Sequence, residues 1–179
     1  LADKLETMGY KVTRNIGGTG VIGEIKGSEP GPVMMLRADM DALPFLIDGE
    51  KKNIHACGHD AHSAMLLAAA SELVGKVKRG TLRILFQQGE ETLKGALAVI
   101  DAGVIEDVDI ALGLHIRPVQ DIAYGEMSPA VRHASSTFVN VVINGLSSHG
   151  ARPHLGVNAI EAAAVAINAI TAIKINPII

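Results

Sequence analysis

The chain of 179 residues is poor in several residue types, and each scarcity excludes or disfavours a class of protein. It has no tryptophan and one cysteine, so no disulfide can form within it, which is typical of a reducing compartment. The 16 basic and 19 acidic residues are mixed along the chain, which argues against a nucleic-acid footprint or a polybasic membrane patch. No apolar run reaches the length of a membrane span. We therefore expect a cytoplasmic protein that binds neither nucleic acid nor membrane.

Hydrophobic residues make up 48% of the chain, enough for a substantial core. The first residues predict an amphipathic helix rather than a secretory signal. The sequence does not begin with methionine, and it stops at Ile175-Asn-Pro-Ile-Ile179 as though a buried strand were beginning. We interpret it as a fragment of a longer protein.

Periodicity predicts alternating helices and strands over the first part of the chain. Helices are expected at residues 1–9, 60–76 and 95–101, and strands at 11–16, 21–26, 33–43, 82–86 and 108–115. The predicted helix at 60–76 is apolar on nearly all sides, so we expect it to be buried against a sheet. Short apolar strands separated by helices are typical of a mostly parallel sheet. The expected fold class is α/β.

The pattern changes near residue 134. An extended apolar run at 138–143 is followed by a polar, turn-rich stretch and then by a helix predicted over 157–174. We therefore predict two domains. Residues 1–133 would form a metal-binding α/β domain, and 134–179 would be the start of a smaller α+β domain.

Candidate metal ligands follow three of the predicted strands. The run His55-Ala-Cys57-Gly-His59-Asp60-Ala-His62 stands at the start of a helix, Glu90-Glu91 follows the strand at 82–86, and His115 ends the strand at 108–115. Ligands gather at strand ends in open α/β sheets. This arrangement is what a two-metal hydrolase site needs.

The spacing indicates which of these residues could bind metal and which could contact the water. Cys57 and His59 are two apart in a glycine-containing turn, so both can face one point. Adjacent glutamates should diverge, so that one of Glu90 and Glu91 binds metal while the other meets the water. A set of thiolate, imidazole and carboxylate suits Zn, Mn, Co or Ni better than Mg or Ca.

Other polar residues near the run are expected to support it. Asp39 and Asp41 on one face of a neighbouring strand could orient an imidazole from behind the metal. Asp60, His55 and His62 are given similar supporting roles, with capping an alternative for His62. Each of these residues, taken alone, could have an ordinary structural role. We interpret His133 and His154 as surface or loop residues. The hypothesis of a metal site rests on the occurrence of the other residues together.

In this order the motifs resemble the aminoacylase/carboxypeptidase family of zinc metallopeptidases, in the amidohydrolase branch that includes hippurate and auxin-conjugate hydrolases. The motifs that carry the resemblance are Leu36-Arg-Ala-Asp-Met-Asp-Ala-Leu-Pro44, His55-Ala-Cys-Gly-His-Asp-Ala-His62, Phe86-Gln-Gln-Gly-Glu-Glu91, Gly113-Leu-His115 and Ser148-His-Gly-Ala-Arg-Pro-His154.

The resemblance implies two divalent metal ions with assigned roles around them. Cys57, His59, Glu91 and His115 would be the metal ligands. Glu90 would be the general base of amide hydrolysis on small N-acyl amino acids. His149 would polarise the scissile carbonyl from a lid domain that also forms a homodimer interface.

Three departures from the family pattern stand out. The family's last metal-binding histidine lies in a later segment that this sequence does not contain. Residues 45–53 form a shorter stretch than the family pattern leads us to expect. Gln88-Gly89 stands where Pro-Ala is commoner, with the spacing to the glutamates unchanged.

Three alternatives remain. One is a dipeptidase or deacylase of the same fold. A second is a thiol hydrolase with Cys57 as nucleophile, although His59 is too near in sequence to be a well-aimed base. The third is a dimerising module without activity, which the presence of Glu90 disfavours.

Overall fold

A five-stranded sheet lies at the centre of the first of two units, Leu1–Asp121, in the computed structural model, which describes residues 1–129 and 138–173. In sheet order its strands are β1 (Lys11–Ile16), β2 (Gly20–Lys26), β6 (Arg79–Gln87), β3 (Glu29–Asp39) and β7 (Ile110–Gly113). β3 pairs in parallel with β6 and with β7, whereas β2 pairs antiparallel with both of its neighbours. β2 is therefore the one strand of the five that runs in the opposite direction. The predicted α/β class with a mostly parallel sheet is confirmed.

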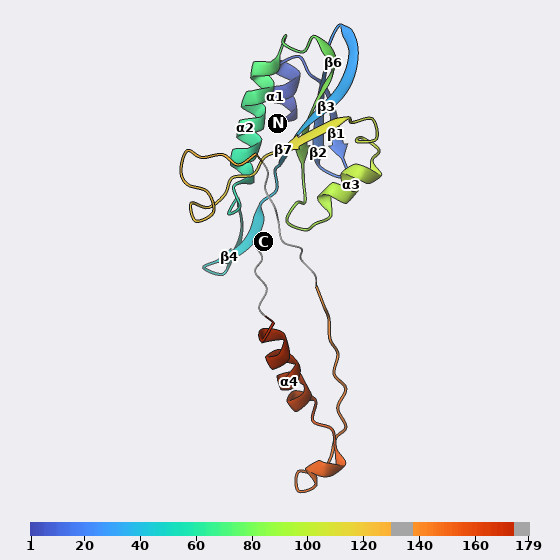
Figure 1. Cartoon of the computed structure of the whole chain (residues 1–179), viewed down its shortest axis with the longest axis vertical. Helices are drawn as coiled ribbons and strands as arrows, with labels where there is room; N and C mark the ends of the chain where they lie inside the picture. The colour runs from blue at the N-terminus through green and yellow to red at the C-terminus, as the bar shows by residue number, and fades with distance from the viewer. Residues whose placement is uncertain (130–137, 174–179) are drawn as a thin grey trace. The chain divides into compact units, whose positions relative to one another are not determined.

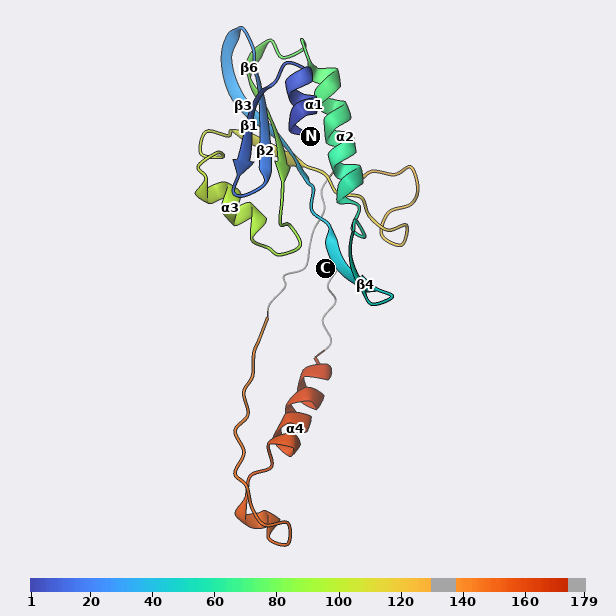
Figure 2. The same ribbon diagram turned by 180° about the vertical axis from the view of Figure 1, so that it is seen from behind.

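Helices cover both faces of this sheet. Figures 1 and 2 show α1 (Ala2–Thr7) and α2 (His59–Leu73) on one face and α3 (Gly95–Asp101) on the other. Residues that alternate along β6 separate the two apolar cores, because successive side chains of a strand point to opposite faces. Ile84 and Phe86 join the core under α1 and α2, whereas Leu85 packs with Val99 of α3.

α2 is buried against the sheet as expected, but only by one side, although its sequence is apolar nearly all round. Its buried residues are His59, His62, Ser63, Leu66 and Ala70. These positions recur at the spacing of one helical face. Met65, on another side of the helix, is 43% exposed.

A β-hairpin that the sequence did not predict joins β3 to α2. Its strands are β4 (Leu43–Ile47) and β5 (Glu50–Ile54), which pair antiparallel around Asp48 and Gly49. Both turn residues have positive φ, at 52° and 79°, as a two-residue hairpin turn of the mirror-image type requires. The stretch at 45–53, shorter than the family pattern led us to expect, is therefore a closed hairpin (Figure 1).

The second unit, Ile122–Ile179, contains the helix α4 (Ala159–Thr171) and a single 3-10 turn (Pro153–Leu155) within its described residues. Asn158 caps α4, because its Oδ1 accepts a hydrogen bond from the Ile160 N–H at 3.0 Å. An isolated bridge pairs Leu146 with Val157, but no strand forms over 138–143. The predicted domain boundary at 133–134 lies outside the described residues. No helix in the described ranges is long and apolar enough to cross a membrane.

Candidate metal centre

His59 occupies the first turn of α2, and the glycine before it makes that placement possible. Gly58 adopts φ 83°, in the left-handed region that glycine tolerates best. A Cβ at this position would also overlap Ile116 Cδ1. The Cys-Gly-His spacing therefore lets the chain turn sharply into the helix, and it leaves the His59 side chain fully buried.

The two ring nitrogens of His59 have different surroundings. Nδ1 donates a hydrogen bond to the Asp41 backbone carbonyl at 3.1 Å, so the lone pair is on Nε2. Nε2 is buried and has no hydrogen-bond partner. It faces three carboxylates, with Glu90 Oε2 at 3.7 Å and with Glu91 Oε1 and Asp39 Oδ2 each at 3.8 Å. A buried, unprotonated ring nitrogen aimed at carboxylates has the surroundings of a metal ligand.

Glu91, Cys57 and His115 complete the set of donors around this point. Ligand atoms of Cys57, His59 and Glu91 lie within 4.8 Å of one another, and Cys57 Sγ is 3.6 Å from His115 Nε2. Glu91 Oε1 is, like His59 Nε2, a buried atom without a hydrogen-bond partner. Metal–ligand bonds of about 2.0–2.3 Å would fit between atoms spaced in this way. The residues present therefore fit a divalent cation.

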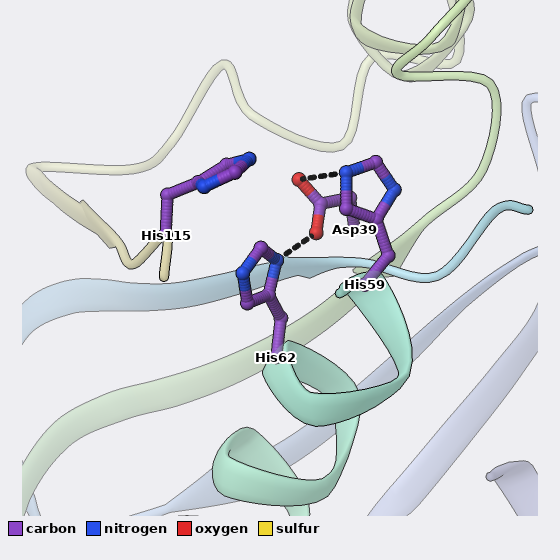
Figure 3. A group of neighbouring side chains, drawn as sticks. All are labelled: Asp39, His59, His62 and His115. Carbon is purple, nitrogen blue, oxygen red and sulfur yellow. Dashed lines mark hydrogen bonds and ion pairs between the residues drawn. The ribbon is translucent and has the colours of Figure 1, made fainter. Parts of the chain in front are cut away.

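A second set of side chains also has donor atoms close enough to share a metal ion, but both ring nitrogens of its His62 already take part in hydrogen bonds. Ligand atoms of Asp39, His59, His62 and His115 lie within 4.8 Å of one another (Figure 3). The Ile116 N–H donates to His62 Nε2 at 2.9 Å, so the proton of His62 is on Nδ1, which faces Asp39 Oδ1 at 2.5 Å. Both ring nitrogens of His62 are thus engaged in hydrogen bonds, which suits it better to supporting the centre than to binding metal.

Asp39 is an ionised carboxylate inside the protein. Burial alone would raise its pKa, but the hydrogen bond from His62 and the charge of Arg37 outweigh burial and hold the pKa below its usual range. Arg37 Nη1 bonds Asp39 Oδ2 at 2.9 Å. The Arg37 guanidinium also donates from Nε to the Gln87 side chain at 3.0 Å.

The Cys57 thiol lies in surroundings that disfavour its anion. Burial raises the pKa of Cys57, and the nearby carboxylates of Glu91, Glu90 and Asp39 raise it further. In this environment the thiolate needs a cation beside it. A thiol held neutral in this way is a poor nucleophile.

Most of the residues proposed from the sequence meet at one place. Cys57, His59, Glu90, Glu91 and His115 surround it. Asp41 lies behind His59 at Nδ1, whereas Asp39 Oδ2 lies 3.8 Å from its Nε2. Asp60 is exposed and is not part of this group. His55 is exposed too, and its Nδ1 shares the Asp41 carbonyl with His59.

The remaining histidines lie in or beside the second unit. His149 Nδ1 accepts a hydrogen bond from the Ala151 N–H at 3.2 Å, which places the ring proton on Nε2. His154 lies in the 3-10 turn and is exposed. His133 lies outside the described residues.

Sequence reasoning did not find two of the contacts near the centre. The first is made by Arg37, which bonds the carboxylate that supports His62. Gln88 was noted only as a departure from a family pattern. Arginine two residues before a buried aspartate on one strand is a signal that could have found the first contact, because such residues share a face.

Comparison with known proteins adds independent information. The sequence pattern that defines Peptidase family M20/M25/M40 matches residues 35–175. The chain is 37% identical over 193 residues to thermostable carboxypeptidase 2 of Saccharolobus solfataricus, covering 99% of this chain and 49% of that protein. It is 37% identical over 182 residues to a hippurate hydrolase of Campylobacter jejuni, covering 97% and 48%. The chain spans about half the length of the curated relatives it matches.

Solved structures share the fold. The YXEP protein of Bacillus subtilis, described as a dinuclear metal binding peptidase of the M20 family, has a TM-score of 0.59 and 38% identity. That likeness covers 65% of this chain and 35% of the other.

Proposed function

Because the chain belongs to Peptidase family M20/M25/M40, we propose that its protein is a metal-dependent amidohydrolase that cleaves the amide bond of N-acyl amino acids or related conjugates. The observation that carries this proposal is the buried, unpartnered Nε2 of His59, which lies 3.7 Å from Glu90 and 3.8 Å from Glu91. The substrate class is supported by the names of relatives, among them hippurate hydrolase.

Cys57, His59, Glu91 and His115 would hold the metal pair. Two divalent ions, when bound, supply a Lewis acid for the carbonyl and lower the pKa of water enough for attack at neutral pH. The donor set of thiolate, imidazole and carboxylate favours Zn, Mn, Co or Ni. Asp41 orients His59 through its carbonyl, and Asp39 orients His62 beside it.

Glu90 is proposed as the general base. Its carboxylate stands beside His59 and its side chain is 35% exposed, so both water and substrate can reach it. It would accept a proton from the attacking water and deliver that proton to the departing amine. Glu91 Oε1 is buried and lies among the donor atoms, which suits it better to metal binding.

His149 is proposed as a hydrogen-bond donor to the scissile carbonyl oxygen. Its Nδ1 accepts from the Ala151 N–H, so its Nε2 carries a proton that can be donated to an oxygen on which negative charge develops. We further propose that the protein is cytoplasmic and forms a homodimer through its second unit.

The alternatives differ in what they require of these residues. A dipeptidase or deacylase would use the same centre on another substrate. A thiol hydrolase would need an activated Cys57, and the raised pKa of this thiol argues against it. A dimerising module without activity would need neither Glu90 nor a buried His59 nitrogen without a hydrogen-bond partner.

The test is metal analysis by mass spectrometry on the full-length protein, together with a panel of N-acyl amino acids and dipeptides. Two ions per chain and hydrolysis of the N-acyl substrates are the expected results. Preference for dipeptides would favour the first alternative. Activity that survives chelation but not thiol alkylation would overturn the proposal in favour of the second. Bound metal without hydrolysis of any amide would favour the third.

A further inference from the structure

The turn between β1 and β2 lies against the loop that carries Glu90. Gln88 follows the last residue of β6 and stands two residues before Glu90. Its side-chain Nε2 donates a hydrogen bond to the backbone carbonyl of Gly17, in that turn, at 2.5 Å. A side chain at the start of the loop is thus joined to a turn more than 70 residues earlier in the sequence.

Packing at this contact is close. A Cβ on Gly20, at the other end of the turn, would lie 2.6 Å from Gln88 Oε1. That oxygen is buried and has no hydrogen-bond partner. Burying an unpartnered amide oxygen costs stability, and an apolar side chain would avoid this cost. The hydrogen bond from Nε2 to the Gly17 carbonyl offsets part of this cost.

The same turn also contacts the far end of the loop. A Cβ on Gly17 would lie 2.7 Å from the backbone of Ala98 in α3, so the turn touches the helix that follows the loop. The Gly95 N–H at the start of α3 donates to the Gly89 carbonyl at 3.0 Å, which closes the base of the loop. The turn therefore contacts the residues on both sides of the segment that contains Glu90 and Glu91.

This segment is closed on itself, so its placement depends on how its base is held. Gly89 has φ 65°, and its carbonyl accepts hydrogen bonds from the Gly95 N–H and from the Thr92 hydroxyl, each at 3.0 Å. Glu91 is held directly, because its N–H donates to Asp41 Oδ2 at 3.1 Å. A shift of the β6 end relative to the turn would move Glu90 away from His59.

We propose that Gln88 is a positioning residue that braces the Glu90 loop against the β1–β2 turn and so keeps the Glu90 carboxylate beside His59. The proposal rests on the proposed function, in which Glu90 is the base. Gln88 itself does not touch the reacting atoms. Its effect is expected on turnover, because misplacing a catalytic group by about 1 Å can cost about 100-fold in rate.

The test compares Gln88→Met with Gln120→Met in the full-length protein. Methionine keeps the length of glutamine without its amide, and Gln120 is an exposed glutamine of the same unit. Hydrogen–deuterium exchange of the amides at residues 89–94 is measured on metal-free protein, and kcat and KM are measured on metal-loaded protein. Gln88→Met should speed exchange about 10-fold or more and lower kcat about 10- to 100-fold, with KM changed less than about 3-fold. Gln120→Met should change neither.

The two readouts separate the possible failures. Unchanged kcat in Gln88→Met overturns the proposal, whether or not exchange becomes faster. An equal loss with Gln120→Met also overturns it. If Gln88→Met does not fold, Gln88→Asn keeps an amide one methylene too short to reach Gly17, and the same results are required of it. If the wild type cleaves no amide, the proposed function fails, and the positioning role fails with it even if the exchange data establish the brace.

Discussion

Oδ1 of Asp39 lies 2.5 Å from Nδ1 of His62, and both side chains are completely buried. The other carboxylate oxygen of Asp39 bonds Arg37, and the other ring nitrogen of His62 accepts from the Ile116 N–H. A continuous set of hydrogen bonds thus runs from β3 through α2 to the residue after His115. It fixes the segment that carries one proposed ligand relative to the helix that carries another.

Replacing Asp39 with asparagine should destabilise the protein. The substitution keeps the size of the side chain but removes the charge that pairs with Arg37. It also leaves one acceptor oxygen where Arg37 and His62 now bond two. Breaking a buried ion pair costs about 3–5 kcal/mol. Urea denaturation of the metal-free protein measures the free energy of unfolding. Asp101→Asn, at an exposed position at the end of α3, should change it by less than about 0.5 kcal/mol. A loss for Asp39→Asn as small as that of the control would show that the pair contributes little.

Replacing Glu90 with glutamine should abolish most turnover and leave the metal in place. The amide cannot accept a proton from water, and loss of a general base typically costs about 100- to 10,000-fold in rate. Activity and metal content are measured on the same preparation, with Glu106→Gln as an exposed acidic control in the first unit. Unchanged activity would eliminate Glu90 as the base, and loss of metal would identify it as a ligand.

Replacing His149 with alanine should lower kcat more than it lowers metal content. A hydrogen-bond donor to a developing oxyanion is worth about 100- to 1,000-fold in kcat. His154→Ala is the matched control, because His154 is an exposed histidine five positions later in the same turn-rich stretch. If metal is lost in parallel with activity, the role of His149 is ligation and not carbonyl polarisation.

Tyr10 should make stability depend on alkaline pH. Burial raises the pKa of Tyr10 above its ordinary value near 10, and its hydroxyl donates to the Ala70 carbonyl of α2 at 2.8 Å. Because the folded protein binds this proton more tightly, the contribution to stability is complete below pH 10 and is lost as pH rises through the folded-state pKa. Tyr10→Phe should cost about 1 kcal/mol at neutral pH, and this deficit should shrink at higher pH. Urea unfolding between pH 8 and 11 checks it, and a deficit that stays constant would contradict the raised pKa.

The sequence predicted the sheet and the approximate place of the centre because both depend on local patterns. The apolar run of β6 and the strand at Lys11–Ile16 were apparent from periodicity, and Glu90 and His115 were proposed because they follow strands. The β4–β5 hairpin was not predicted, because every residue of β5 is exposed and its sequence does not alternate. Asp48-Gly49 was the available signal for that turn, since this dipeptide favours two-residue hairpins.

Contacts between residues far apart in the sequence could not be predicted, because periodicity and motifs describe only neighbouring residues. The bond between His62 and Asp39 joins residues 23 positions apart, and that between Gln88 and Gly17 joins residues 71 apart. The periodicity of the sequence does not indicate which ring nitrogen of His62 accepts a hydrogen bond. The proposed support role of His62, which the sequence left open beside capping, rests on the hydrogen bond from the Ile116 N–H.

The acceptor that orients His59 is the main-chain carbonyl of Asp41, and that group also takes a hydrogen bond from His55. Every amino acid has this carbonyl, so the hydrogen bond from His59 Nδ1 does not depend on an aspartate at position 41. The Asp41 side chain has contacts of its own, because its Oδ1 lies 3.4 Å from His59 Nδ1 and its Oδ2 accepts from the Glu91 N–H. Alanine at position 41 would therefore keep the main-chain bond to His59 and remove the carboxylate that holds Glu91.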